Sequence, residues 1–192
     1  MQTVVGVLRG GSSKEHEISL ESGAAMLANL PEDRYIARDI YIDKTGQWHD
    51  RGRPAAPERV LRQLDMVFLP LHGEYGESGK VQHLLERFGV PYVGANAYGS
   101  HLSMHKLLSK MRAKDAGLLT PESHFIERAE DIEVGAREVI RRFHQPVVVK
   151  PVGWGSSVGV SIVGGYAPVL AAIDQLFADG AAAVLVEEYI QG

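Results

Sequence analysis

Residues 147–160 read VVVKPVGWGSSVGV, and this stretch decides how the rest of the chain is interpreted. Three valines lead to Lys150 and Pro151, a loop rich in glycine and serine follows, and a second β-branched run extends to Val163. The pattern predicts a strand, a loop of small residues and a second strand. Glycines let backbone N–H groups approach phosphate oxygens, and serine hydroxyls and a strand-borne lysine add donors and positive charge. From these residues alone, a polyphosphate site and a mobile hairpin loop with a surface lysine both stay open.

Two common phosphate motifs are excluded. A Walker loop needs Gly-Lys followed by Ser or Thr, whereas Gly79 and Lys80 are followed by Val81. The dinucleotide fingerprint G-x-G-x-x-G leads into a helix, whereas the glycines of residues 153–159 have another spacing and lead into a strand. The turn after the first predicted strand reads RGGSS at residues 9–13, which disfavours a nicotinamide-dependent oxidoreductase.

Composition narrows the class of protein. The chain has 192 residues, 45% of them hydrophobic and 23% charged, and its formal charge of −4 gives no basic field that would point to nucleic acid. The lack of cysteine excludes disulfides, cysteine-based zinc sites and thiol nucleophiles, and it fits a cytoplasmic protein. No apolar run reaches the length of a membrane span and the start lacks a signal-peptide pattern, so no membrane partner is expected.

The first half of the chain alternates predicted strands with predicted helices, which indicates an α/β domain. Strands are expected at residues 4–8, 35–42, 66–69 and 90–93, and helices at 13–30, 58–64, 79–88 and 100–117. The domain boundary is expected within residues 95–119. In the second half, strands are expected at 123–126, 147–151, 158–163 and 183–189, and helices at 133–143 and 166–177.

Loops at the ends of predicted strands carry candidate site residues. Glu15 and His16 follow the first strand, and His72 lies among glycines after the third. Because ligands of open α/β sheets bind at the carboxyl ends of strands, these side chains are placed to contact a substrate. On spacing alone, however, a helix-capping role is favoured for Glu15, and a lone histidine is commonly structural. Lys106 lies on a predicted helix, where lysines are usually solvated.

The last predicted strand ends in Glu187 and Glu188. Two carboxylates at the end of a buried strand can accept hydrogen bonds from an adenine amino group or from ribose hydroxyls. An edge strand that simply leaves into solvent is the alternative, and the residues themselves do not decide between the two.

Five segments together resemble the D-alanine–D-alanine ligase family of the ATP-grasp superfamily. They are GGSSKEHEIS at residues 10–19, LHGEYGESG at 71–79, LSMHK at 102–106, VKP at 149–151 with GSSVG at 155–159, and LVEEY at 185–189. Each segment alone is weak, but the five follow the order of the family and cover nearly the whole chain. The resemblance implies a Rossmann-like N-terminal domain over residues 1–95 and an α+β half of an ATP-grasp domain over 96–192, with the C-terminal part of that domain absent.

The resemblance also implies roles for individual residues. Glu15 would bind the ammonium group of the first D-alanine and orient Ser156, and His72 would lie beside this substrate and the transferred phosphate. The implied ATP-binding residues are Lys106 and Lys150 for the phosphates, Gly155 and Ser157 in the loop over them, and Glu187, Glu188 and Ile190 around the adenine. Two positions depart from the family: Trp154 replaces an acidic residue, and His105 replaces an aspartate, so loop contacts are expected to differ.

The implied reaction is the ATP-dependent ligation of two D-alanines for peptidoglycan precursor synthesis. ATP phosphorylates the carboxylate of one D-alanine, and the amine of the second attacks the acyl phosphate. The protein must align these groups, neutralise the developing charge and exclude water. The family also needs Mg²⁺ or Mn²⁺, but the stretch that supplies its acidic ligands is absent, so no metal ligand is expected here. We therefore expect that these 192 residues alone do not turn over.

The expected partners are ATP and D-alanine, and family members commonly form homodimers through the N-terminal domain. Two alternative functions stay open. One is another ATP-grasp carboxylate–amine ligase with a different acid or amine, and the other is a non-catalytic nucleotide-binding module completed by a partner chain.

Overall fold

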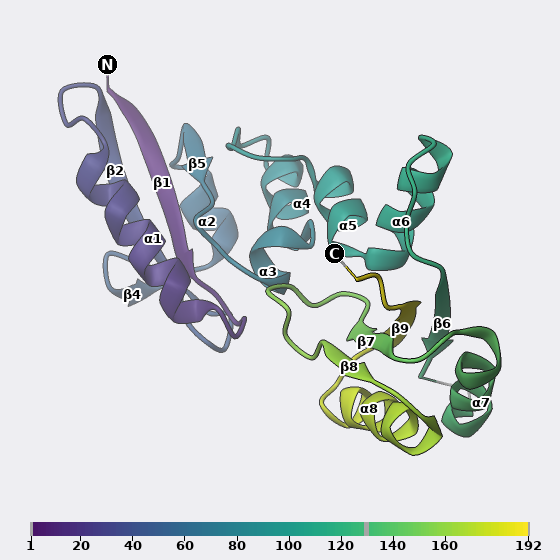
Figure 1. Ribbon diagram of the computed structural model, residues 1–192. Coiled ribbons are helices and arrows are strands. Elements are labelled where there is room, and N and C mark those ends of the chain that lie inside the picture. The colour runs from purple at the N-terminus through teal and green to yellow at the C-terminus, as the bar shows by residue number, and fades with distance from the viewer. Residues whose placement is uncertain (1, 129–130, 192) are drawn as a thin grey trace. The chain divides into compact units, whose positions relative to one another are not determined.

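The computed structural model describes residues 2–128 and 131–191, which form two compact units, Met1–His101 and Leu102–Gly192 (Figure 1). Each unit has its own sheet and its own buried apolar cluster. The chain is therefore organised around two separate cores.

A five-stranded sheet organises the first unit. Its strands are β1 (Thr3–Gly10), β2 (Tyr35–Ile42), β3 (Trp48–Asp50), β4 (Arg53–Pro54) and β5 (Met66–Phe68), in the order β4-β3-β2-β1-β5. β2, β1 and β5 run parallel, which confirms the α/β prediction, whereas β3 and β4 form an antiparallel hairpin that was not predicted. Because β1 and β5 are parallel neighbours, the loops that follow them meet at one edge of the sheet.

Helices cover both faces of this sheet. They are α1 (His16–Asn29), α2 (Pro57–Leu61), α3 (Glu74–Glu77) and α4 (Lys80–Arg87), followed by α5 (Ala97–Met104). α1 packs closely on β1, since Gly23 lies against the side chain of Arg9. Successive strand residues face opposite ways, so Leu8 points to the other face. The core on that face contains Leu8, Ile40, Ile42, Trp48, Val60, Leu61, Val67, Val81 and Leu85.

A four-stranded antiparallel sheet organises the second unit. Its strands are β6 (Ser123–Glu127), β7 (Val147–Pro151), β8 (Ser161–Val163) and β9 (Ala183–Glu188), in the order β6-β9-β7-β8, and its helices are α6 (Lys106–Asp115), α7 (Ile132–Arg142) and α8 (Tyr166–Ala178). α7 and α8 lie together on one side of the sheet (Figure 1). With the sheet they bury Ile126, Val139, Val147, Val149, Val169, Ile173, Leu176, Val184 and Val186. This arrangement confirms the predicted α+β second half.

The alternation along β7 and β9 places the charged residues on the other face of this sheet. Val149 and Val186 point into the core with α7 and α8. Their neighbours Lys150 and Glu187 therefore point away from that core, toward the side where α6 lies.

The helix predicted at residues 100–117 is wrong, because it is two helices. His105 between them has extended backbone dihedrals, φ −82° and ψ 98°, and its ring Nδ1 accepts a hydrogen bond of 3.3 Å from the N–H of Leu108. His105 thus caps the start of α6. Lys106 is the first residue of that helix rather than a position near the middle of a longer one.

Two further strand predictions differ from the structure. At residues 158–163 only β8 pairs, because Ser156, Ser157 and Gly159 have φ values of 47°, 58° and 74° and keep the preceding chain in turns. At residues 90–93 there is no strand, only an isolated bridge between Tyr92 and Val67.

Candidate functional site

In the first unit, serine side chains join the loops that follow β1 and β5. The Ser19 hydroxyl donates to the carbonyl of Pro70 at 2.6 Å and accepts from the N–H of Gly10 at 2.8 Å. The Ser13 hydroxyl donates to the carbonyl of His72 at 2.7 Å. These bonds hold the two loops together at the carboxyl edge of the parallel strands.

This arrangement brings the loops of Glu15 and His72 together. Gly73 has φ +74°, and a Cβ added there would lie 2.7 Å from Glu15 Oε2, so the carboxylate sits against the backbone beside His72. The ring Nε2 of His72 lies 3.0 Å from the hydroxyl of Ser22. Glu15 occupies the N-cap position of α1, and its side chain makes no capping hydrogen bond there.

His16 has a structural role instead of the expected substrate contact. Its side chain is buried, and its Nδ1 lies 2.6 Å from the carbonyl oxygen of Gly11. The ring also makes an edge contact with Tyr41. Because the ring is buried and its Nδ1 is engaged within the fold, His16 contributes to the structure of this loop.

In the second unit, three lysines surround one buried carboxylate. Glu187 is only 5% exposed, and its two oxygens bind different lysines. Oε1 pairs with Lys110 Nζ at 2.6 Å, and Oε2 pairs with Lys150 Nζ. Lys110 comes from α6, Lys150 from β7 and Glu187 from β9, so three separate elements converge on one carboxylate.

Lys106 adds a third ammonium group to this cluster. Its Nζ donates to the carbonyl of Trp154 at 2.5 Å, and its backbone N–H donates to the carbonyl of Val152. Burial lowers the pKa of the Lys106 ammonium, the positive charge of Lys150 lowers it further, and Glu187 acts in the opposite sense. Three lysines against one glutamate leave excess positive charge at a partly buried place, which favours binding of an anion.

The loop between β7 and β8 is strained where it carries the predicted serines. Ser156 and Ser157 are exposed and both adopt left-handed backbone dihedrals, φ 47° and 58°, which L-residues rarely take outside functional turns. Trp154 fixes the base of this loop, because its ring packs against the core of the unit and lies where a Cβ on Gly159 would be. The bulky substitution at Trp154 therefore anchors the loop to the fold.

Glu188 and Ile190 lie differently from Glu187. Oε1 of Glu188 accepts a hydrogen bond of 2.8 Å from the N–H of Glu122, which joins the end of β9 to the start of β6. Ile190 is 60% exposed. Glu187 is thus the one carboxylate of the pair that lies within the lysine cluster.

Lys110 is the site residue that sequence reasoning missed. Its side chain is 11% exposed, and its Nζ also donates to the carbonyl of Pro121 at 2.6 Å. The available signal was its spacing from Lys106, since residues four apart lie on the same face of a helix. That signal depended on placing the start of α6 at Lys106.

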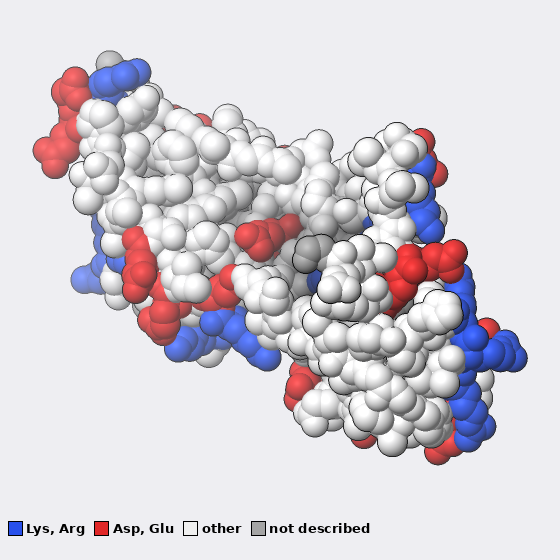
Figure 2. Space-filling view, viewed as in Figure 1, with Lys and Arg blue, Asp and Glu red and all other residues white. Residues whose placement is uncertain are grey.

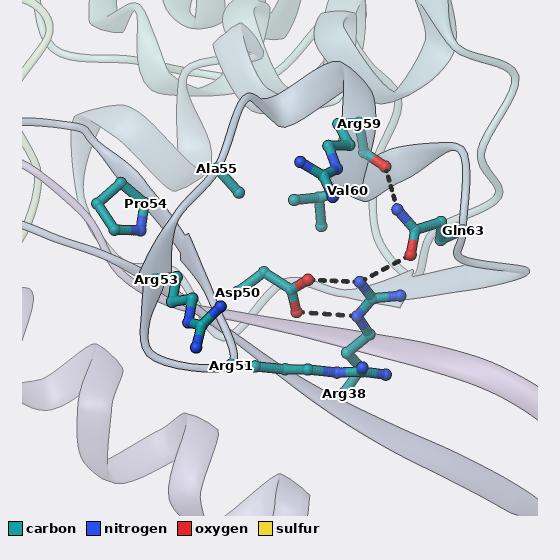
Figure 3. Close-up of a pocket in the computed structure, with 9 residues that line it drawn as sticks. All are labelled: Arg38, Asp50, Arg51, Arg53, Pro54, Ala55, Arg59, Val60 and Gln63. Carbon is teal, nitrogen blue, oxygen red and sulfur yellow. Dashed lines mark hydrogen bonds and ion pairs between the residues drawn. The ribbon is translucent and has the colours of Figure 1, made fainter.

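A further polar pocket of about 510 Å³ lies in the first unit, and none of the predicted site residues lines it (Figure 3). Arg38 makes a two-pronged contact with Asp50, with Nε 2.9 Å from Oδ1 and Nη2 2.5 Å from Oδ2, and a third bond of 3.1 Å to Gln63. The guanidinium holds the pKa of Asp50 below its ordinary value. This network joins β2 to β3 and to the chain after α2.

Charged side chains elsewhere on the second unit pair with one another. Figure 2 shows Lys and Arg gathered near α7 together with Asp and Glu. Arg137 pairs with Glu133 at 2.7 Å, and Arg141 pairs with Glu138 at 2.5 Å. These exposed pairs neutralise part of the basic side of α7.

Within residues 2–128 and 131–191, no three His, Cys, Asp or Glu side chains are grouped so that they could hold a metal ion. None of the helices described there is both long enough and apolar enough to cross a membrane.

Known protein sequences resemble the chain over nearly its whole length. Residues 4–59 and 49–95 match the family described as D-ala D-ala ligase N-terminus, and residues 113–192 match D-ala D-ala ligase C-terminus. The D-alanine–D-alanine ligases of Geobacter sulfurreducens and Desulforudis audaxviator are 38% and 40% identical, over 99% and 98% of this chain and 56% and 58% of their own length. The chain thus spans less than two thirds of the curated relatives it matches.

Solved structures show the same similarity. The VanG D-Ala:D-Ser ligase from Enterococcus faecalis superposes with a TM-score of 0.86 at 28% identity, over 100% of this chain and 64% of that one. The D-alanine–D-alanine ligase from Bacillus anthracis superposes with a TM-score of 0.81 at 32% identity, over 99% and 58%. A structure of the Bacillus anthracis ligase complexed with ATP gives a TM-score of 0.79 at 30% identity, over 99% and 60%.

Proposed function

Because the chain belongs to the D-alanine–D-alanine ligase family, we propose that it supplies the phosphate-binding lysines and part of the amino acid site of an ATP-dependent ligase. The enzyme joins two D-alanines into D-alanyl-D-alanine for peptidoglycan precursor synthesis in the cytoplasm. The observation that carries the proposal is the cluster of Lys106, Lys150 and the buried Glu187 beside the serine loop.

The second unit provides the nucleotide half of the site. Lys106 and Lys150 bind the phosphates, because an anion relieves the electrostatic cost that lowers the pKa of Lys106. The loop carrying Gly155 and Ser157 covers the phosphates with hydroxyl and backbone donors. Glu187 accepts a hydrogen bond from the adenine amino group, and Glu188 and Ile190 border the same pocket.

The first unit provides the amino acid half. Glu15 binds the ammonium group of the first D-alanine, since its carboxylate lies at the carboxyl edge of the parallel strands. His72 lies beside this substrate, with its ring oriented by the hydroxyl of Ser22.

In the reaction, a carboxylate oxygen of the first D-alanine attacks the γ-phosphorus of ATP, and ADP leaves with the bond electrons. The amine of the second D-alanine then attacks the acyl carbon, phosphate leaves and the amine loses a proton. The lysines neutralise charge on the transferred phosphoryl group, and the positioned groups supply alignment. Mg²⁺ or Mn²⁺, when bound in the full-length enzyme, would neutralise charge on the phosphates. The described residues offer no grouped ligand set for this ion.

The proposal separates binding from turnover. Since the chain spans 56–62% of the length of its relatives, the complete reaction belongs to the full-length protein, which we also propose is a homodimer through its N-terminal domain. For these 192 residues we expect ATP binding, without D-alanine-dependent release of phosphate.

Calorimetric titration of the 192-residue chain with ATP, combined with a phosphate-release assay, tests this. Lys150→Met should abolish ATP binding, whereas Lys80→Met, at an exposed lysine of the first unit that pairs with Glu74, should leave it unchanged. Clear phosphate release that depends on D-alanine would refute the expected lack of turnover. Failure of the unaltered chain to bind ATP would refute the nucleotide site.

A second candidate function differs in the amino acid used as the second substrate. The similarity to the VanG D-Ala:D-Ser ligase, with a TM-score of 0.86, favours a related ligase that accepts D-serine. A screen of D-amino acids as the second substrate of a full-length version separates the two, because only one of D-alanine and D-serine should support efficient phosphate release at low concentration.

A further inference from the structure

Lys110 is less exposed than Lys150 and has no role in the function proposed so far. Its side chain is 11% exposed, compared with 21% for Lys150. Its Nζ is held between two acceptors, Glu187 Oε1 and the carbonyl of Pro121, each at 2.6 Å. A lysine fixed in this way has lost its rotamer freedom and cannot reach out to a ligand, so it acts through its neighbour.

Its partner Glu187 forms ion pairs with two lysines. In the free chain, Lys150 occupies Oε2 and Lys110 occupies Oε1. If a phosphate group draws Lys150 away, the buried carboxylate keeps only its ion pair with Lys110. A buried carboxylate that loses every partner is strongly destabilising, so the pair with Lys110 leaves Glu187 a partner when Lys150 moves away.

We propose that Lys110 is a positioning residue that holds the Glu187 carboxylate in place while Lys150 moves from Glu187 to the nucleotide phosphate. Oε2, released by Lys150, then accepts a hydrogen bond from the exocyclic amino group of the purine. Lys110 thereby selects 6-amino purines over 6-oxo purines, which present a carbonyl oxygen to the carboxylate. This inference rests on the proposed nucleotide site and extends it to base selectivity.

The two nucleotides that test it are ADP and inosine diphosphate, which differ in the amino or oxo group at position 6 of the base and share the same phosphates. Calorimetry gives the dissociation constant of each for the 192-residue chain. We expect the unaltered chain to prefer ADP by about tenfold or more, as sites that pair with a polar group reject analogues lacking it. Lys110→Met should remove most of this preference, and Lys110→Arg should restore most of it.

Two further variants serve as controls for the result with Lys110→Met. Lys114→Met makes the same change at an exposed position one turn later on α6 and should leave both affinities unchanged. The double variant Lys110→Met with Glu187→Gln removes the unpaired buried charge, so it stays measurable if Lys110→Met alone unfolds. Because Lys110 acts through Glu187, the double variant should show no greater loss of preference than Glu187→Gln alone.

The outcomes are distinguishable. If Lys110→Met weakens ADP and inosine diphosphate by the same factor, or if the double variant loses more preference than Glu187→Gln alone, the positioning role is overturned while the nucleotide site stands. If the unaltered chain binds neither nucleotide, the proposed function fails and the inference fails with it.

Discussion

At Lys106, burial and a neighbouring positive charge act against the protonated amine. The pKa of this lysine is lowered, first by burial and then by Lys150. Because the folded pKa lies below the ordinary value, the charged form costs folding free energy at neutral pH. That cost disappears once the pH rises above the ordinary lysine pKa, where the amine is neutral in both the folded and the unfolded chain. A site that binds anions thus lowers the stability of the free protein.

Replacing Lys106 should therefore have different effects on the free energy of unfolding and on nucleotide affinity. For Lys106→Met we expect ADP affinity to fall by about tenfold or more, because a charged hydrogen bond to phosphate is lost. The free energy of unfolding of the unaltered chain, relative to the variant, should rise as the pH increases from the lowered folded pKa of Lys106 to the ordinary lysine pKa of about 10.4. Urea unfolding at several pH values measures this, with Lys114→Met as the exposed control. If the difference in unfolding free energy between the unaltered chain and Lys106→Met stays constant with pH, the lowered pKa of Lys106 is contradicted.

Gly159 is the residue on which the serine loop closes against the core. It has φ +74°, and a Cβ there would lie 2.8 Å from Leu176 Cδ2 and 3.1 Å from Trp154 Cζ3. Gly159→Ala should therefore cost about 2–4 kcal/mol of unfolding free energy, through the left-handed backbone and the clash together. Gly180 has φ +97° with nothing within 4 Å, so Gly180→Ala should cost only about 1 kcal/mol. Thermal unfolding compares the two, and equal losses would exclude a packing role for Gly159.

At the scale of elements, the contact between Arg38 and Asp50 holds β2 to the unpredicted β3–β4 hairpin. Their side chains are 10% and 17% exposed, and the same two-pronged geometry links Arg9 to Asp39, which is 43% exposed. We expect Asp50→Asn to cost about 1–2 kcal/mol, and Asp39→Asn less than about 1 kcal/mol, because exposed pairs are screened by solvent.

The contribution of Asp50 should depend on pH in a defined direction. The pKa of Asp50 is lowered by its bond to Arg38, so the stabilisation is present above the ordinary carboxyl pKa and is lost as the pH falls through the folded value. Chemical unfolding at neutral and acidic pH should show Asp50→Asn converging on the unaltered chain in acid. A gap that widens in acid would contradict this.

Elements with a long periodic pattern could be predicted from the sequence, and short ones could not. The parallel strand β2 and the helix α8 carry enough apolar residues to define their period. β3 and β4 span three and two residues, too few to show any alternation. The break at His105 depends on one side-chain cap, which apolar periodicity cannot reveal.

At the scale of the whole molecule, motifs identified residues but not their partners. Lys150 and Glu187 were predicted as separate contacts to ATP, yet in the structure they pair with each other. Lys110 belongs to no quoted motif, and only the fold brings it from α6 to β9. The contact between Glu15 and Ser156 involves one residue from each unit and stays a prediction.

The two cores imply that the units unfold separately, and the two tryptophans can report this. Trp48 is buried in the first core, and Trp154 packs against the second, so Trp154→Phe and Trp48→Phe each leave a reporter for one unit. Ile173→Ala, at a fully buried position, should cost about 2–5 kcal/mol and lower the urea midpoint seen by Trp154. The urea midpoint seen by Trp48 should not move.

The matched change Leu85→Ala in the first core should give the reverse, because each substitution leaves the other cluster intact. Equal shifts of both midpoints would mean that the chain unfolds as one cooperative unit.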